Sequence, residues 1–211
     1  MLKTEPYSEQ VKVWPKAGRH ILAQFDDETV IVYQAYRKSI GRFAAEHGCF
    51  GGEFSYSRMS WIKPNFLWMM YRCGWGTKTD QEVTIALRLR RTFFDSILAA
   101  AAPSSWDREL FAHEDEWARA VAGSSVRLQW DPDHHPSGAK QDRRAIQLGL
   151  RGDVLEAFAT RELVEVIDLS MFVAEQRATL AASGVDALVI PRERVYRLAD
   201  PAVTARLRLD D

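Results

Sequence analysis

Residues 64–72 read PNFLWMMYR, and their spacing predicts a short helix that is apolar on nearly every side. Pro64 suits the first turn of such a helix. Large apolar side chains then follow on both sides: Phe66, Leu67, Trp68, Met69, Met70 and Tyr71. A helix of this kind must be covered in almost every direction. The fold therefore has to supply layers around it, and we expect Phe66, Leu67, Met69 and Met70 to be core residues.

Cations lie among these apolar residues, at Arg58, Lys63, Arg72 and Lys78. Arg72 falls in the last helical turn, where it can bond the free carbonyl groups without any ligand. Burying an unpaired cation costs several kcal/mol, and few acidic residues lie nearby in the sequence. We therefore expect Arg58, Lys63 and Lys78 to face one cavity that holds an anion. The alternative is a plain core helix with structural charges at its ends.

Strand and helix patterns elsewhere predict an α+β fold, a single domain with a mixed, mostly antiparallel sheet flanked by helices. A long polar loop, 131–143, joins two strands and makes them antiparallel. Residues 82–90 alternate as a half-buried strand. The expected strands are 29–35, 54–59 (short or merely extended), 82–90, 125–130, 144–150, 162–169 and 192–198, and the expected helices are 37–48, 64–72, 91–102, 106–123, 153–159 and one after residue 170.

The domain is expected to span residues 1–211, with 1–18 as a peripheral N-terminal arm and 199–211 as a C-terminal tail. No GxGxxG follows the first strand and no GxxxxGK[ST] occurs, which excludes the dinucleotide fingerprint and the P-loop. The N-terminus lacks a signal-peptide core, no apolar run is long enough to span a membrane, and two cysteines cannot form a disulfide framework. These features predict a cytoplasmic protein.

A second group of polar residues lies where the first strand gives way to a helix, in VYQAYRKS (32–39). The period of a strand places Gln34 and Tyr36 on one face. Arg37 begins the helix and is equally a ligand contact or a solvated first-turn charge, while Lys38 is better explained as solvated. In GWGTK, the glycines at 74 and 76 allow close backbone approach, and Trp75 between them is suited to stacking on a base.

Acidic and histidine residues cluster in WDPDHHP (130–136), which has the composition of a metal site. The two histidines are adjacent rather than spaced to converge, so a solvated loop is the better interpretation and no metal is predicted. There is no GxSxG motif, and neither cysteine has an evident histidine partner. The catalytic residues, if the protein has any, stay unassigned.

The blocks VYQAYRKSIGRFAAEHG, RMSWIKPNFLWMMYRCGWGTK, RLQWDPDH and RRAIQLGL resemble the DUF4291 family, over about residues 19–197. The resemblance implies an adenine-nucleotide-binding protein. The order of the first elements is also similar to the start of the ADP-ribosyltransferase fold. In that likeness Gln34 or Arg37, with Tyr56 or Ser57, would stand where NAD is held. Such a likeness of fold does not establish transferase activity.

We therefore expect a protein that binds AMP, ATP or NAD, as a nucleotide-dependent transferase of unassigned reaction. The base would stack on Trp61 or Trp75. The predicted contact residues are Gln34, Tyr36, Arg37, Arg58, Trp61, Lys63, Trp75, Lys78 and Gln147. The alternative is a non-enzymatic module for single-stranded RNA or protein, favoured by the arginine and aromatic content. A net charge of −1 and the lack of any RNP, KH or zinc signature weigh against nucleic acid.

Overall fold

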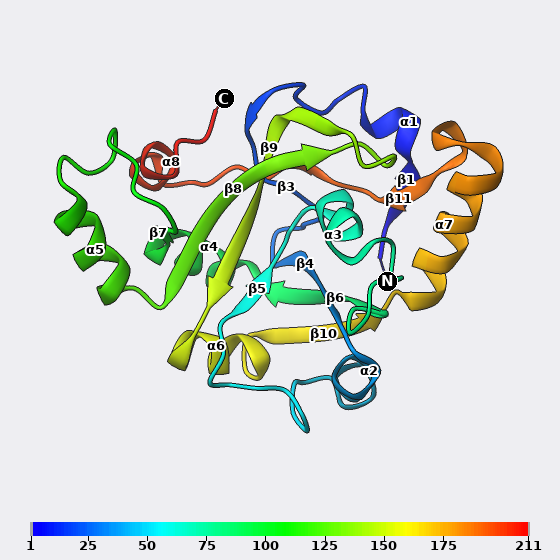
Figure 1. Ribbon diagram of the computed structural model, residues 1–211, viewed down its shortest axis with the longest axis horizontal. Coiled ribbons are helices and arrows are strands. Elements are labelled where there is room, and N and C mark those ends of the chain that lie inside the picture. Colours follow the sequence, from blue (N-terminus) through cyan, green and yellow to red (C-terminus); the bar gives the residue numbers. More distant parts are fainter. Residues whose placement is uncertain (1, 211) are drawn as a thin grey trace.

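Two main β-sheets carry the fold in the computed structural model, which describes residues 2–210 (Figure 1). The first sheet is antiparallel, in the order β10-β6-β4. The second is built on the β8–β9 hairpin, with β5 antiparallel to β9, β2 parallel to β9 and β7 parallel to β8. The strands are β2 (Gly18–Arg19), β4 (Thr29–Tyr36), β5 (Ser60–Ile62), β6 (Val83–Arg90), β7 (Ala102–Pro103), β8 (Val126–His134), β9 (Lys140–Leu150) and β10 (Leu163–Asp168).

The first sheet lies between two hydrophobic cores. On β4, Val30 and Val32 face one core, and Ile31 and Tyr33 face the other, as the period of a strand requires. The first core is shared with the second sheet and with α2 (Lys38–His47), α4 (Arg91–Ala100) and α6 (Gly152–Ala159). The second contains α3 (Phe66–Cys73) and part of α7 (Ser170–Ser183). The predicted α+β class, with mostly antiparallel pairing, is confirmed.

Strand β6 differs from its prediction as a half-buried strand. Leu87 and Leu89 face the first core, but Thr84 and Ala86 on the opposite face are also fully buried. In the sequence, the small residues Thr84 and Ala86 resemble the solvent-facing side of a strand, because they carry little apolar surface. In the structure, this face is covered by α3 and α7, and small side chains allow the close packing. β6 is the central strand of its sheet, covered on both faces.

Helix α3 is buried as predicted, with Phe66, Leu67, Met69 and Met70 all in the core. Asn65 is its N-cap, and its side-chain oxygen accepts a bond from the Trp68 amide at 2.7 Å. The helix therefore begins after Pro64 rather than with it. Gly74 ends the helix in the left-handed region with φ 59°, a conformation that glycine adopts without strain.

Four segments differ from their predictions, and one of them is the strand expected at 192–198, of which only Arg194–Val195 (β12) is a strand. The short strand expected at 54–59 is a series of turns, and the strand lies at Ser60–Ile62 instead. The helix expected at 106–123 begins at Glu114 (α5, Glu114–Gly123), because Asp107 pairs with Arg208 and caps a separate turn. The expected polar loop 131–143 is mostly strand, since β8 and β9 extend to His134 and from Lys140.

The hairpin extends because its charges are paired inside the fold. Asp133 is 1 % exposed and accepts two bonds from the Arg143 guanidinium across the two strands, at 2.8 Å from Nε and 2.5 Å from Nη2. A third guanidinium nitrogen bonds the Pro15 carbonyl oxygen. Polar composition suggested a loop, but a buried ion pair with its hydrogen bonds satisfied is compatible with a strand.

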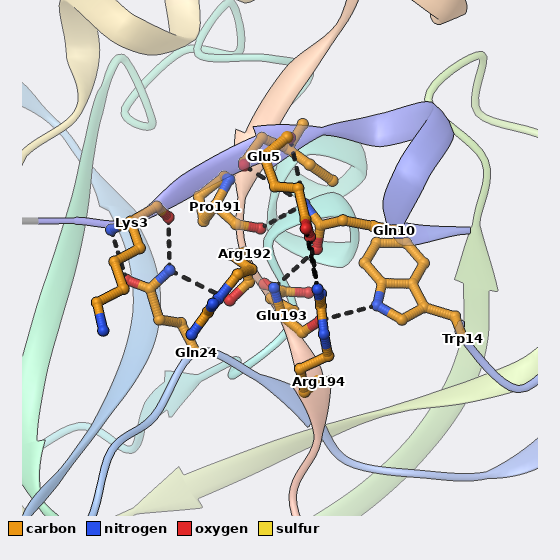
Figure 2. A network of polar contacts seen from close by, with 10 residues as sticks. Lys3, Glu5, Gln10, Trp14, Gln24, Pro191, Arg192, Glu193 and Arg194 are labelled. Atoms are coloured by element: carbon orange, nitrogen blue, oxygen red, sulfur yellow. Dashed lines mark hydrogen bonds and ion pairs between the residues drawn. The ribbon is translucent and has the colours of Figure 1, made fainter. Parts of the chain in front are cut away.

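The N-terminal segment is joined to the far end of the chain (Figure 2). β1 (Thr4–Pro6) pairs with β11 (Val189–Pro191), and β3 (Leu22–Ala23) pairs with β12 (Arg194–Val195). The Gln10 side chain is fully buried, donating to the Pro191 carbonyl at 3.0 Å and accepting from the Glu193 amide at 2.7 Å. Trp14 donates to the Glu193 carbonyl at 3.0 Å. The segment 2–18 is thereby anchored by buried side chains.

The remaining helices lie at the periphery. They are α1 (Tyr7–Gln10), the 3-10 turn η1 (Val185–Ala187) and α8 (Pro201–Leu207), which lies within the expected C-terminal tail. Helix α5 stands at the edge of the molecule and buries none of its residues (Figure 1). Within residues 2–210, no helix has the length and apolarity to cross a bilayer.

Candidate functional site

A cavity of about 530 Å³ opens where β4 and β5 separate. The two strands are linked by a single bridge, in which the amide groups of Tyr33 and Lys63 bond each other's carbonyls at 2.7 and 3.2 Å. Beyond this bridge β4 leads into α2, and a gap remains between the strands. The loop 53–59 and one side of α3 close the gap. The volume lies within the range of small-molecule sites, roughly 300–1,000 Å³.

The cavity brings together most of the predicted contact residues. The ones that line it are Gln34, Tyr36, Arg37, Arg58, Trp61 and Lys63. They come from two distant parts of the sequence, the end of β4 and the region around β5. Their meeting follows from the β4–β5 bridge, which places the two segments side by side.

Lys63 lines the cavity and is only 6 % exposed. Its Nζ makes one long hydrogen bond, 3.4 Å to the Trp61 carbonyl oxygen. Within residues 2–210, no carboxylate lies within 4.0 Å of it. Burial, and then the nearby Arg72, lower the pKa of Lys63 from 10.5 to about 8, against the opposing pull of Asp131. This is the unpaired buried cation that the sequence predicted.

Gln34 lies beside Lys63, because the side chains of both donate to the Trp61 carbonyl oxygen. The Gln34 Nε2 is 3.1 Å from that oxygen and 2.7 Å from the Ser60 hydroxyl. Its Oε1 is buried and has no partner among the described residues. The Tyr36 hydroxyl bonds the same Ser60 hydroxyl at 2.9 Å, and burial raises the pKa of Tyr36 above its ordinary value of 10. The cavity lining thus contains a buried acceptor without a partner next to an amine that makes one long hydrogen bond.

The arginines of the cavity differ in their partners. Arg37 at the rim forms an exposed ion pair with Glu53 at 2.7 Å, so its charge is largely balanced. Arg58 and Arg72 are exposed and form no ion pair in the part of the chain that the structure describes. Together with Lys63 they make the wall strongly positive, and the acidic side chains that line it are Glu53 and Asp80.

Trp61 forms one wall of the cavity and is held against a glycine. It pairs with Gly149 of β9. A Cβ atom at position 149 would lie 3.0 Å from the Trp61 ring and 2.6 Å from the Met59 sulfur. Real Cβ atoms do not approach other atoms so closely, so glycine is needed for the indole to lie flat on the strand. The aromatic wall therefore depends on the β5–β9 pairing.

Trp75, Lys78 and Gln147 lie outside this cavity. Trp75 packs edge-on against Phe66, in the second core. Lys78 donates to the Arg72 carbonyl oxygen at 2.7 Å, which caps the end of α3. Gln147 donates to Asp131 at 2.7 Å on the face of the β8–β9 hairpin. Each has a local structural role in the fold.

Arg72 is the cavity residue that the sequence interpretation assigned elsewhere. It was expected to bond the last carbonyl groups of α3, but Lys78 takes that position and leaves the Arg72 guanidinium at the cavity. Either side chain can cap a helix that ends in this way. In the sequence, the only signal that Lys78 could replace Arg72 as the capping residue was the presence of this lysine six positions after the arginine.

Tyr56 and Ser57, the residues suggested by the ADP-ribosyltransferase likeness, do not line the cavity. The Tyr56 hydroxyl donates to the Phe50 carbonyl at 3.0 Å, and the Ser57 hydroxyl bonds that of Ser55. Among residues 2–210, no three His, Cys, Asp or Glu side chains are arranged to hold a metal ion. The acidic and histidine residues at 131–135 lie in or next to the β8–β9 hairpin.

The sequence was compared with family models and with curated proteins. The family model described as "Domain of unknown function (DUF4291)" matches residues 20–196, which is most of the 211-residue chain. The matched region contains both cavity-forming segments, β4 and β5. No curated protein matches the sequence significantly.

Proposed function

We propose that this chain, which belongs to the DUF4291 family, binds an adenine nucleotide in the cavity between β4 and β5. The observation that carries the proposal is Lys63, a cation that is almost fully buried and has no carboxylate partner in residues 2–210. Such a charge lowers the stability of the fold unless an anion joins it. An anionic ligand is therefore the missing partner.

Phosphate is the anion that the surroundings favour. Arg58 and Arg72 line the same cavity, and neither side chain forms an ion pair within residues 2–210, although the Arg72 guanidinium lies over the Trp68 ring at 5.9 Å. One arginine guanidinium can bind two phosphate oxygens at once. The family resemblance noted in the sequence points to an adenine nucleotide. In our proposal the two arginines bind the phosphate groups and Lys63 adds its charge from below.

The base has a suitable wall in Trp61. An exposed indole face can stack on a base, a contact worth about 1–3 kcal/mol. Gln34 lines the same cavity, and its Oε1, which is buried and has no partner among the described residues, can accept from the adenine amino group once the side chain turns toward the ligand. The transferase activity expected from the sequence has no assigned catalytic residue and stays a prediction.

Isothermal titration calorimetry with AMP, ATP and NAD tests the proposal, with adenosine and inorganic phosphate as partial ligands. We expect binding of at least one nucleotide, and weaker binding of either partial ligand. Arg72→Ala should lower the affinity about tenfold or more, since one charge-assisted contact is worth about 1.5–3 kcal/mol. The matched control is Lys78→Ala, six residues away and outside the cavity, which should leave the affinity unchanged.

Two outcomes would overturn the proposal. The first is the absence of heat with every nucleotide at millimolar concentration. The second is an equal loss of affinity in Arg72→Ala and Lys78→Ala, which would place the ligand elsewhere. A gel shift with single-stranded RNA that weakens steeply with salt would support the RNA-binding alternative instead.

A further inference from the structure

The backbone of Lys63 is held in place. It is bonded to Tyr33 in both directions, and Pro64 restricts the backbone of the residue before it, which is Lys63. The Lys63 side chain is almost fully buried and lines the cavity. An amine positioned in this way meets an incoming ligand with little loss of conformational entropy.

The surroundings of the amine favour its neutral form. Burial is the main cause, and Arg72 adds to it, whereas the charge of Asp131 acts in the opposite direction and is outweighed. With a pKa of about 8, roughly a fifth of the Lys63 amine is neutral at pH 7.4. An ordinary lysine has about one part in a thousand neutral at that pH. The neutral amine is the nucleophilic form, and desolvation next to another cation is a known way to activate lysine.

We propose that Lys63 is a nucleophile that captures the carbonyl carbon of a phosphate-bearing aldehyde entering the cavity, forming an imine. The ligand class is defined by two features of the site. Arg58 and Arg72 at the opening bind the phosphate, and the buried amine meets the carbonyl group below them. This inference goes beyond nucleotide binding, because it assigns a covalent step to one residue.

The step balances without a further reagent. The Nζ lone pair attacks the carbonyl carbon, a C–N bond forms, and the carbonyl oxygen takes up the proton that the nitrogen loses. The C–O bond of the resulting carbinolamine then breaks, and the hydroxyl group leaves as water with the second proton of the nitrogen, so that a C=N bond remains. Neither oxidation nor reduction occurs, and addition of water reverses the step.

The other lysines provide an internal comparison. Lys78 is exposed, and its amine donates to the Arg72 carbonyl oxygen at 2.7 Å. Lys12 is exposed and paired with Glu9 at 2.7 Å. Both lie outside the cavity, so neither combines a buried amine with arginines that can bind a phosphate.

Labelling with pyridoxal 5′-phosphate, followed by borohydride reduction and peptide mass spectrometry, tests the proposal on the wild-type chain. At pH 7.4 we expect Lys63 to be labelled at least tenfold faster than Lys12 and Lys78. 5′-Deoxypyridoxal, which lacks the phosphate and has no 5′-hydroxyl that could close onto the aldehyde as a hemiacetal, should label Lys63 about tenfold more slowly, in line with one lost charge-assisted contact. The rate at Lys63 should level off above about pH 8, while the rates at exposed lysines keep rising.

Labels on Lys12 and Lys78 with none on Lys63 would overturn the proposal, as would equal rates at Lys63 with 5′-deoxypyridoxal and pyridoxal 5′-phosphate. Added AMP separates this proposal from nucleotide binding. If AMP slows the labelling of Lys63, both proposals are supported. If Lys63 is labelled but AMP has no effect, the reactive amine stands and nucleotide binding in this cavity fails. If calorimetry detects AMP while Lys63 stays unlabelled, nucleotide binding stands and the reactive amine fails.

Discussion

Replacing Lys63 by methionine should make the protein more stable while removing its ligand affinity. Methionine has a similar length and no charge, so it can fill the same buried space. The folded state lowers the pKa of Lys63 from 10.5 to about 8, and each unit corresponds to about 1.4 kcal/mol. Carrying the buried cation therefore costs about 3 kcal/mol, and Lys63→Met should recover much of this.

The sign of the pH dependence follows from the direction of the shift. Below about pH 8 the lysine is charged in both the folded and the unfolded state, so the full cost is present. Between pH 8 and 10.5 the folded state loses its proton first, and the cost disappears. The advantage of Lys63→Met over the wild type should accordingly be largest at pH 7 and small near pH 10.5.

Urea denaturation of both proteins at pH 7, 8.5 and 10 measures this difference directly. In a thermal melt at pH 7, the melting temperature of the variant should be roughly 6–12 °C above that of the wild type. This is the shift expected when a chain of this size gains about 3 kcal/mol of stability. Lys78→Met is the matched control, an exposed lysine whose loss should change stability by less than about 1 kcal/mol at each pH. A Lys63→Met protein that is less stable at pH 7, with no trend in pH, would refute the assignment of an unsatisfied buried cation.

Two further substitutions examine the packing around the site. Gly149→Ala should destabilise the protein by about 1–3 kcal/mol in a urea titration, because the new methyl group overlaps the Trp61 ring. The control is Gly123→Ala, which has no atom within 4 Å of the new Cβ and should be neutral or stabilising. Equal effects of the two substitutions would refute the argument. Burial raises the pKa of Glu193 well above 4.5 even though its carboxylate accepts from the Phe66 amide. The wild type should thus lose stability relative to Glu193→Gln as pH rises above 4.5. Urea midpoints of both proteins at pH 4 and pH 7 measure this. A stability advantage of the variant that does not grow from pH 4 to pH 7 would contradict the argument.

Local patterns in the sequence predicted the elements that have a strong period. The strand at 29–35 and the buried helix at 64–72 were both recognised from the spacing and type of their apolar residues, and the structure confirms them as β4 and α3. Segments governed by distant partners were predicted less well. The polar composition of residues 131–143 suggested a loop, but this part of the β8–β9 hairpin contains a buried ion pair between Asp133 and Arg143. Composition reports the polarity of a side chain, and only a partner across the sheet determines whether it can be buried.

The sequence by itself determined that unpaired cations would lie beside an apolar wall, because acidic residues are scarce around Arg58, Lys63, Arg72 and Lys78. Only the tertiary structure decided which of them face the cavity. The β4–β5 bridge brings Lys63 beside Gln34, and Lys78 takes the helix-end carbonyl group that was expected for Arg72. All these side chains carry the same charge and similar reach, so the sequence cannot distinguish their roles. The difference arises from the direction in which each side chain leaves the backbone, and that is fixed by packing between segments far apart in the chain.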